Sequence, residues 1–167
     1  MNNKSFFLTT LAALMLLGTL LPGSFGCRMT STFWEDENSR NLQLATYRNA
    51  ILPYSLDYPS GLMPDDENNG TVFFRSDRGV PLVVRYHDEA EGKRRGAWFE
   101  YEPVGETELA GRKGQKYIYD HWEGPFHTRT IAYVIAYRGK FLGLEFRTPG
   151  ELTEIQKQIV ESFMIAE

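Results

Sequence analysis

The residues best suited to metal chemistry lie around one turn late in the chain. Asp120 and His121 precede the turn sequence Glu123-Gly124-Pro125, and His127 follows it. Carboxylate oxygen and imidazole nitrogen both bind Zn²⁺ in proteins, and a hairpin would bring the two sides of this turn together. Neither a fourth ligand nor a general base is evident. A metal-dependent hydrolase using Asp120, His121 and His127 is therefore the alternative hypothesis, and surface histidines at a hairpin end are the simpler interpretation.

A second oxygen-rich segment, residues 65–70, has the sequence Asp-Asp-Glu-Asn-Asn-Gly and resembles the start of an EF-hand loop. Its third position is Glu67. Its twelfth position, where a calcium loop needs a bidentate glutamate, is Ser76. We interpret the segment as a solvated acidic loop, and we expect no cofactor and no bound metal ion.

The sequence also lacks a recognisable nucleophile. It has no Gly-x-Ser-x-Gly motif, and its one cysteine, Cys27, belongs to the N-terminal region. The segment from Gly111 to Gly114 is too short for a phosphate-binding loop. We therefore expect no catalytic residue, and the sequence favours a binding function over catalysis.

The strongest candidate for a surface site is a basic segment followed by aromatic residues. Arg94 and Arg95 are followed closely by Trp98 and Tyr101. Arginine, tryptophan and tyrosine are enriched among the residues that dominate the energetics of protein interfaces. We predict that Arg94, Arg95, Trp98 and Tyr101 bind a partner. In the alternative, Trp98 belongs to the core beneath a solvated basic loop.

The N-terminus has the pattern of an export signal. Lys4 is followed by a largely apolar run of 16 residues, from Phe6 to Leu21, and then by Pro22-Gly23-Ser24. A transmembrane helix needs about 20 apolar residues. The shorter run therefore predicts a cleaved signal peptide over residues 1–26.

The only cysteine directly follows this signal. Gly26 and Cys27 match the end of a bacterial lipobox, although Ser24 stands where leucine is usual. We predict a lipoprotein in which acyl chains such as palmitate on Cys27 hold the exported protein on a membrane of the cell envelope. Arg28 replaces the aspartate that retains lipoproteins at the inner membrane, which favours the outer membrane, facing the periplasm. A soluble exported protein with an incidental Cys27 is the alternative.

Composition and charge fit one domain behind a polar tether. Residues 27–42 are polar and without periodicity, apart from Phe33 and Trp34, which we expect to pack on the domain. Residues 43–167 have the length of a single domain. With 18 basic and 22 acidic residues, the net charge of −4 argues against nucleic acid as a partner.

The most regular stretch runs from Arg129 to Phe163. Residues 129–137 alternate bulky and small side chains as a strand does, and Arg138-Gly139 can close a hairpin to a second strand. That turn pairs Ile135 with Leu142 and Val134 with Gly143. A capping box from Thr148 to Glu151 then predicts a C-terminal helix at about residues 149–164. The other strands are short with tight turns, which predicts an α+β fold: an antiparallel sheet of about six strands with packed helices.

Two parts of this pattern resemble a known family. Residues 54–62, Tyr-Ser-Leu-Asp-Tyr-Pro-Ser-Gly-Leu, resemble the opening signature of PsbP-like exported proteins, aromatic-x-hydrophobic-x-Tyr-Pro-x-Gly-Trp, with Leu62 in place of tryptophan. The two strands and the helix that end at Phe163 are also similar. The resemblance covers roughly Tyr54 to Phe163. It implies an α-β-α sandwich and carries no catalytic residues.

The leading hypothesis is thus an envelope lipoprotein with a non-catalytic domain for protein binding, ligand binding or assembly. Its expected partners are the membrane, through the lipid on Cys27, and an envelope protein.

Overall fold

The computed structural model describes residues 33–34, 42–123, 126–148 and 150–166. The predicted signal peptide, Cys27 and most of the predicted tether lie outside the described residues. The side chains of residues 121–123, 126 and 127 lie outside them as well.

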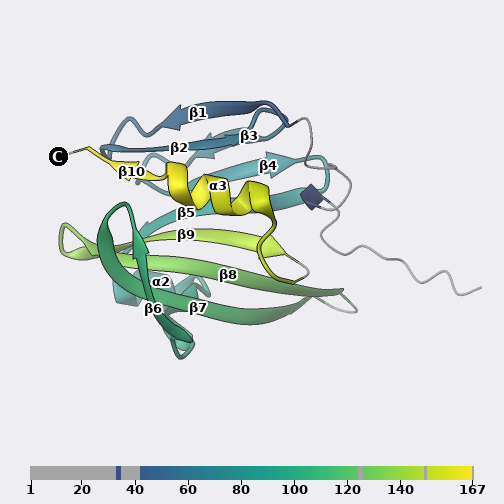
Figure 1. Cartoon of the computed structure of the whole chain (residues 1–167). Helices are drawn as coiled ribbons and strands as arrows, with labels where there is room; N and C mark the ends of the chain where they lie inside the picture. Colours follow the sequence, from purple (N-terminus) through teal and green to yellow (C-terminus); the bar gives the residue numbers. More distant parts are fainter. Residues whose placement is uncertain (1–32, 35–41, 124–125, 149, 167) are drawn as a thin grey trace, which may run out of the picture.

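A seven-stranded antiparallel sheet forms the centre of the domain (Figure 1). Its strands, in spatial order, are β3 (Met63–Asp66), β4 (Val72–Ser76), β5 (Gly79–His87), β9 (Lys140–Thr148), β8 (Phe126–Tyr137), β7 (Arg112–Glu123) and β6 (Gly105–Leu109). Neighbours in this order are mostly consecutive in the chain, which is what short hairpin connections produce. The exception is β5, which pairs with β9.

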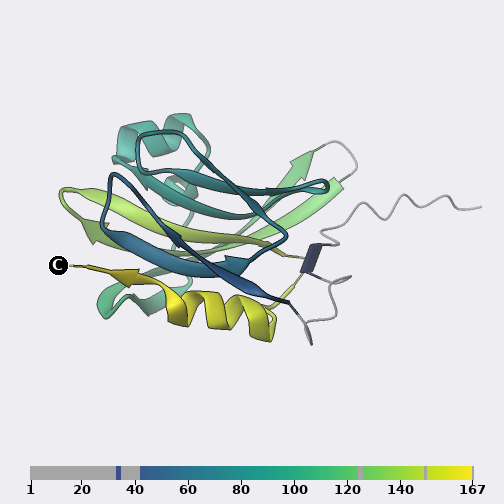
Figure 2. The ribbon, with the colours of Figure 1, turned by 90° about the horizontal axis from the view of Figure 1, so that it is seen from above.

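A second, three-stranded sheet contains β1 (Leu44–Arg48), β2 (Tyr54–Pro59) and β10 (Met164–Ile165), with β2 in the middle. Together with helix α3 (Glu154–Ser162) it covers one face of the large sheet. The opposite face carries helix α2 (Glu89–Arg94) and the 3-10 helix η1 (Trp98–Glu100), as Figure 2 shows. The predicted α+β class is confirmed, whereas the prediction of about six strands is wrong, because the described residues form sheets of seven and three. No helix in the described ranges is both long and apolar enough to cross a membrane.

The hairpin β8–β9 has the predicted register. Ile135 lies opposite Leu142 and Val134 opposite Gly143. Arg138 and Gly139 both have positive φ angles, 49° and 74°, as a two-residue type I′ turn requires. Ile135 and Leu142 are almost completely buried on the face toward α3, so the bulky side of the strand faces the main core, as predicted.

The C-terminal helix begins later than predicted. Its N-cap is Thr153, whose side chain accepts from the backbone N–H of Gln156, and the Gln156 side chain accepts from the backbone N–H of Thr153. Thr148 instead ends β9, opposite Arg129, and is 1% exposed. Both threonines begin a sequence typical of a capping box. Strand pairing keeps Thr148 in the sheet, so α3 spans Glu154–Ser162 and not residues 149–164.

The prediction of an acidic loop at residues 65–70 is partly wrong. Asp65 and Asp66 belong to the edge strand β3, in which Asp66 pairs with Val72. Pro64 is compatible with this position, because an edge strand can leave one side of its backbone unpaired. The turn itself is confined to residues 67–71.

Phe33 and Trp34 pack on the domain, as expected, although they are separated in sequence from the rest of the core. They are 8% and 4% exposed. The Trp34 indole N–H donates to the backbone carbonyl of Arg147 at 2.9 Å, and its ring contacts Phe146 edge-on at 6.1 Å. This short segment therefore closes the main core where β9 ends.

Candidate binding site

We call the face of the large sheet that carries α2 and η1 the η1 face. Its own small core consists of Ala97, Trp98, Tyr119, Ala132 and Val134. The indole ring of Trp98 lies against Gly143, where an added Cβ would lie 2.5 Å from Cζ3 of the indole. Trp98 is completely buried, so it belongs to the core and cannot contribute to the predicted partner surface.

The other residues of the predicted partner surface differ in their contacts. Arg94 is exposed at the end of α2. Arg95 forms ion pairs with Glu67 at 2.9 Å and with Glu91 at 3.2 Å. Tyr101 stacks on Tyr119, with ring centroids 4.3 Å apart. The sequence pattern thus identified a segment that contacts the sheet. Arg95 and Tyr101 have partners within the protein, and Arg94 is exposed.

A buried ion pair crosses the η1 face between β5 and β9. Arg85 Nε lies 2.6 Å from Glu145 Oε1, and the two side chains are only 11% and 4% exposed. The Arg85 guanidinium also lies over the Phe73 ring, 5.6 Å from its centroid. Burial raises the pKa of the Glu145 carboxyl, and the neighbouring Arg85 limits that rise. This pair is a structural feature, because neither group reaches an open surface.

His87 is the second buried titratable group of this face. It is completely buried at the end of β5, and its Nδ1 lies 3.6 Å from the carboxylate of Glu91 on α2. Neither ring nitrogen has a hydrogen-bond partner among the described residues. Burial lowers the pKa of His87, an effect that Glu91 opposes and that Arg85 and Arg95 reinforce. The imidazole is therefore neutral at pH 7.

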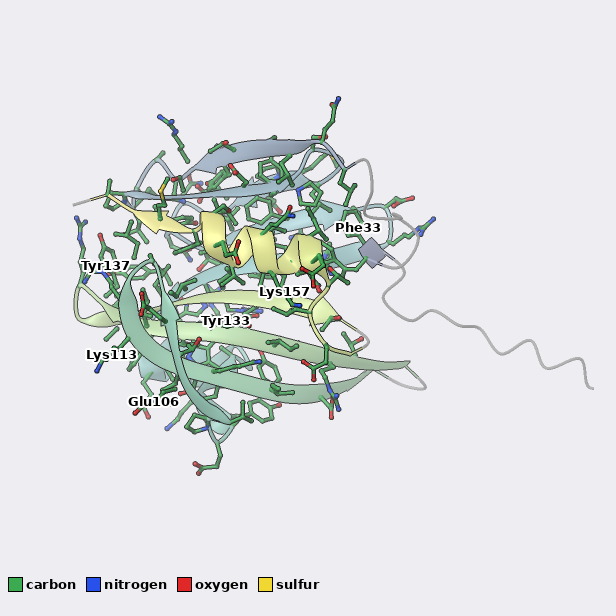
Figure 3. All side chains as sticks on the ribbon, viewed as in Figure 1. Phe33, Glu106, Lys113, Tyr133, Tyr137 and Lys157 are labelled. Atoms are coloured by element: carbon green, nitrogen blue, oxygen red, sulfur yellow. The ribbon has the colours of Figure 1, made fainter. Side chains whose placement is uncertain are left out.

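An open groove occupies the part of the η1 face that η1 leaves uncovered. Its volume is about 510 Å³, within the range of small-ligand sites. Val134 and Ala136 of β8 line it together with two aromatic residues, Tyr117 of β7 and Phe141 of β9. The polar lining residues come from the β6–β7 hairpin: Glu106, Thr107, Glu108, Lys113 and Gln115. Figure 3 labels two of them, Glu106 and Lys113. We call this feature the β6–β9 groove.

Sequence reasoning did not find this groove, although one signal for it was present. The small side chains of Ala132, Val134 and Ala136 alternate with bulky ones along β8, and so they share one face. A face of small residues leaves space above the sheet. Nothing in the local pattern shows that η1 fills only part of that space, because η1 is placed by tertiary packing.

The residues of the alternative hydrolase lie near the tip of the β7–β8 hairpin. The Asp120 carboxylate accepts from Nε of Arg129 at 3.1 Å. His121 pairs with Thr128, and His127 pairs with Trp122, so the two histidine positions are not opposite each other. Their side chains lie outside the described residues, and the metal-dependent hydrolase stays a prediction. Within the described ranges, no three His, Cys, Asp or Glu side chains form a potential metal site.

The acidic segment of residues 65–70 uses its carboxylates internally. Asp65 pairs with Arg75 at 2.7 Å. Asp66 accepts from the Tyr47 hydroxyl at 2.8 Å and from the backbone N–H of Asn68. These contacts are those of an ordered edge strand and turn, whereas the sequence was interpreted as a solvated loop.

Comparison with known proteins yields similarity of fold. No family model matches the chain, and no curated protein matches it in sequence. A crystal structure of a protein from Bacteroides thetaiotaomicron VPI-5482 is 11% identical, with a TM-score of 0.52 over 73% of this chain and 48% of that one. The chain thus spans about half the length of that protein. The solution structure of cyanobacterial PsbP from Synechocystis sp. PCC 6803 is 15% identical, with a TM-score of 0.47 over 77% of this chain and 96% of that one. The resemblance to PsbP indicated by the sequence concerns the fold alone.

Proposed function

We propose that the chain is an exported lipoprotein of the bacterial cell envelope, whose domain binds a partner in the β6–β9 groove without chemical turnover. The β6–β9 groove itself is the observation that carries this proposal. Its aromatic and small apolar residues offer apolar surface, and its polar residues can fix the orientation of what binds there. The most deeply buried charges of the η1 face, by contrast, already satisfy one another in the Arg85–Glu145 pair.

The site is also mechanically suited to binding. Every residue of its lining comes from the antiparallel ladder β6–β7–β8–β9, in which β7, β8 and β9 are paired on both sides and the edge strand β6 is paired with β7. Groups on strands hold their positions better than groups on loops, and a preformed site loses less conformational freedom on binding. The β6–β9 groove therefore behaves as a rigid receptor.

Filling the β6–β9 groove tests this proposal. Ala136 is an exposed residue of its lining, so Ala136→Trp should occupy the space without disturbing the core. A photocrosslinking amino acid at Gln115 should capture a partner in intact cells, and Ala136→Trp should abolish the product. Gln158→Trp, on the exposed side of α3, is the matched control and should leave the product unchanged. Absence of any crosslink at Gln115, or its persistence in Ala136→Trp, would contradict the proposal.

The anchor is tested separately. Cys27→Ser should move the protein from the membrane fraction to the soluble envelope fraction and abolish its labelling by a fatty acid, because several acyl chains on one cysteine hold a protein stably on a membrane. A wild-type protein that is already soluble and unlabelled would show that Cys27 is not lipidated.

A further inference from the structure

Two hairpin turns lie at the same end of the large sheet, Ala110-Gly111 between β6 and β7 and Arg138-Gly139 between β8 and β9 (Figure 1). Three cationic side chains near these turns lie over tyrosine rings. The guanidinium groups of Arg112 and Arg138 are 5.5 and 5.2 Å from the centroid of Tyr137. The Lys140 ammonium is 5.3 Å from the centroid of Tyr86, whose ring contacts Tyr137 at 6.4 Å. We call these five residues the tyrosine–cation cluster.

The charges of this cluster are not neutralised by the protein. Across the described parts of the chain, none of its three cations forms an ion pair. Among the acidic residues of the neighbouring loops and of the first turn of α2, Glu67 is paired with Arg95 and Glu89 with Lys93. Asp66 and Asp88 accept hydrogen bonds from neutral groups and keep their charge. The three cations of the cluster therefore remain available to an external carboxylate, although the net charge of the chain is −4.

Stacking on the rings restricts the side chains before anything binds. A cation within about 6 Å of the centroid of an aromatic ring is attracted electrostatically by the ring. Tyr137 is only 7% exposed, so it supports the cations and is not itself a surface for insertion into lipid. Interfacial membrane binding normally presents tyrosine or tryptophan rings at the headgroup level. The tyrosine–cation cluster therefore fits a carboxylate-bearing protein surface better than a bilayer.

The position of the cluster also favours a protein partner over the anchoring membrane. Figure 3 shows Tyr137 and Phe33 at opposite ends of the domain. Strand β9 connects the two ends, with Lys140 at the cluster and Arg147 beneath Trp34, a span of about 23 Å at about 3.3 Å per residue. If the chain is anchored through Cys27, as the proposed function holds, the cluster faces away from the anchoring membrane.

We infer that the tyrosine–cation cluster is a docking surface for an acidic segment of a partner protein. Arginine and tyrosine are enriched in protein interfaces, and complementary charge fixes orientation and speeds association. Only the orientation argument rests on the proposed function. The cluster lies outside the β6–β9 groove and shares no residue with it, so each can fail without the other.

Binding to a carboxylate polymer tests this inference. Labelled poly-glutamate should bind the mature chain carrying Cys27→Ser, measured by fluorescence anisotropy, and more weakly as salt rises. The double variant Arg112→Glu and Arg138→Glu should weaken binding at least about tenfold. The control pair Arg78→Glu and Lys157→Glu makes the same change in net charge at exposed positions that belong to no candidate binding site, and it should bind as the parent does. Circular dichroism should show that all three proteins are folded.

Three results would overturn the inference. One is no binding of poly-glutamate by the parent. Another is an equal loss of poly-glutamate affinity in both double variants, which would show that binding depends on net charge alone. The third is tighter binding of phosphatidylglycerol vesicles or polyphosphate than of poly-glutamate, which would assign the cluster to a membrane or to a phosphate polymer. The β6–β9 groove crosslink is unaffected by each of these outcomes, so it reports on the proposed function alone.

Discussion

At Gly143, the absence of a side chain allows η1 to lie directly against the large sheet. The Trp98 ring occupies the space that a Cβ would take. Because Trp98 is completely buried, the ring has no open side toward which it could move. The lack of a Cβ at position 143 therefore allows the close approach of η1 to the large sheet.

Gly143→Ala should lower the free energy of unfolding by about 1–3 kcal/mol, the usual effect of overfilling a packed core. Urea denaturation followed by tryptophan fluorescence measures this change. Gly105→Ala, in edge strand β6, is the control, because an added Cβ there meets no atom within 4 Å. Equal stability of the two variants would show that Trp98 is not held against position 143.

His87 should make stability depend on pH. Its pKa is lowered from the ordinary value of 6.5, chiefly by burial. The folded state therefore binds a proton less readily than the unfolded state. The neutral His87 therefore gives its full contribution to the free energy of unfolding above about pH 6.5. This contribution is lost as the pH falls from about 6.5 toward the lowered pKa of the folded state. The loss is at most about 1.4 kcal/mol per pH unit.

His87→Leu removes this titration. Urea denaturation between about pH 5 and 8 should show the wild type losing stability relative to the variant on the acidic side of about 6.5. Parallel pH profiles for the two proteins would show that the buried imidazole does not titrate differently in the two states.

At the scale of elements, local and long-range features differ in how well the sequence predicts them. The β8–β9 register follows from an adjacent turn and from side-chain alternation, and so the pairing of Ile135 with Leu142 was predicted correctly. The pairing of Ile165 with Tyr54 joins residues far apart in sequence, and the two-residue strand β10 has no periodicity to detect. Trp98 was predicted to bind a partner because charged residues precede it, with a place in the core as the alternative. The alternative holds, because Trp98 packs against Gly143, a residue distant in sequence.

The start of α3 provides a test between two capping boxes. Thr153→Ala removes the side chain that caps the helix and should lower the free energy of unfolding by about 1 kcal/mol. Glu151→Ala removes the residue that the other sequence match would require and, being exposed, should change stability by less than about 0.5 kcal/mol. Thermal unfolding followed by circular dichroism compares the two. A larger loss of stability in Glu151→Ala than in Thr153→Ala would indicate that the helix begins at the predicted position.

At the scale of the whole molecule, the segment before the domain contributes to its stability. Phe33 and Trp34 contact each other at 5.0 Å and together cover the end of the main core. Because both aromatic residues are buried, this segment is held against the domain at the end of the main core. The predicted attachment at Cys27 would thereby also fix which end of the domain lies nearer to the membrane.

Trp34→Ala should lower the free energy of unfolding by about 3–5 kcal/mol, the usual cost of truncating a buried Trp to Ala. Met63→Ala is the control, because Met63 is 69% exposed and its loss should have little effect. Urea denaturation of the mature chain measures both. An unchanged stability in Trp34→Ala would mean that the segment does not stay on the domain in solution.

The ion pair between Arg85 and Glu145 constrains how this sequence can diverge. Loss of either residue alone leaves a buried charge without its counterion, which typically costs about 3–5 kcal/mol, whereas replacement of both by apolar residues is often neutral or stabilising. Evolutionary paths that change one position first pass through a poorly folded intermediate. Homologous sequences should therefore keep both residues or neither. An alignment of homologues in which positions 85 and 145 vary independently would contradict this expectation.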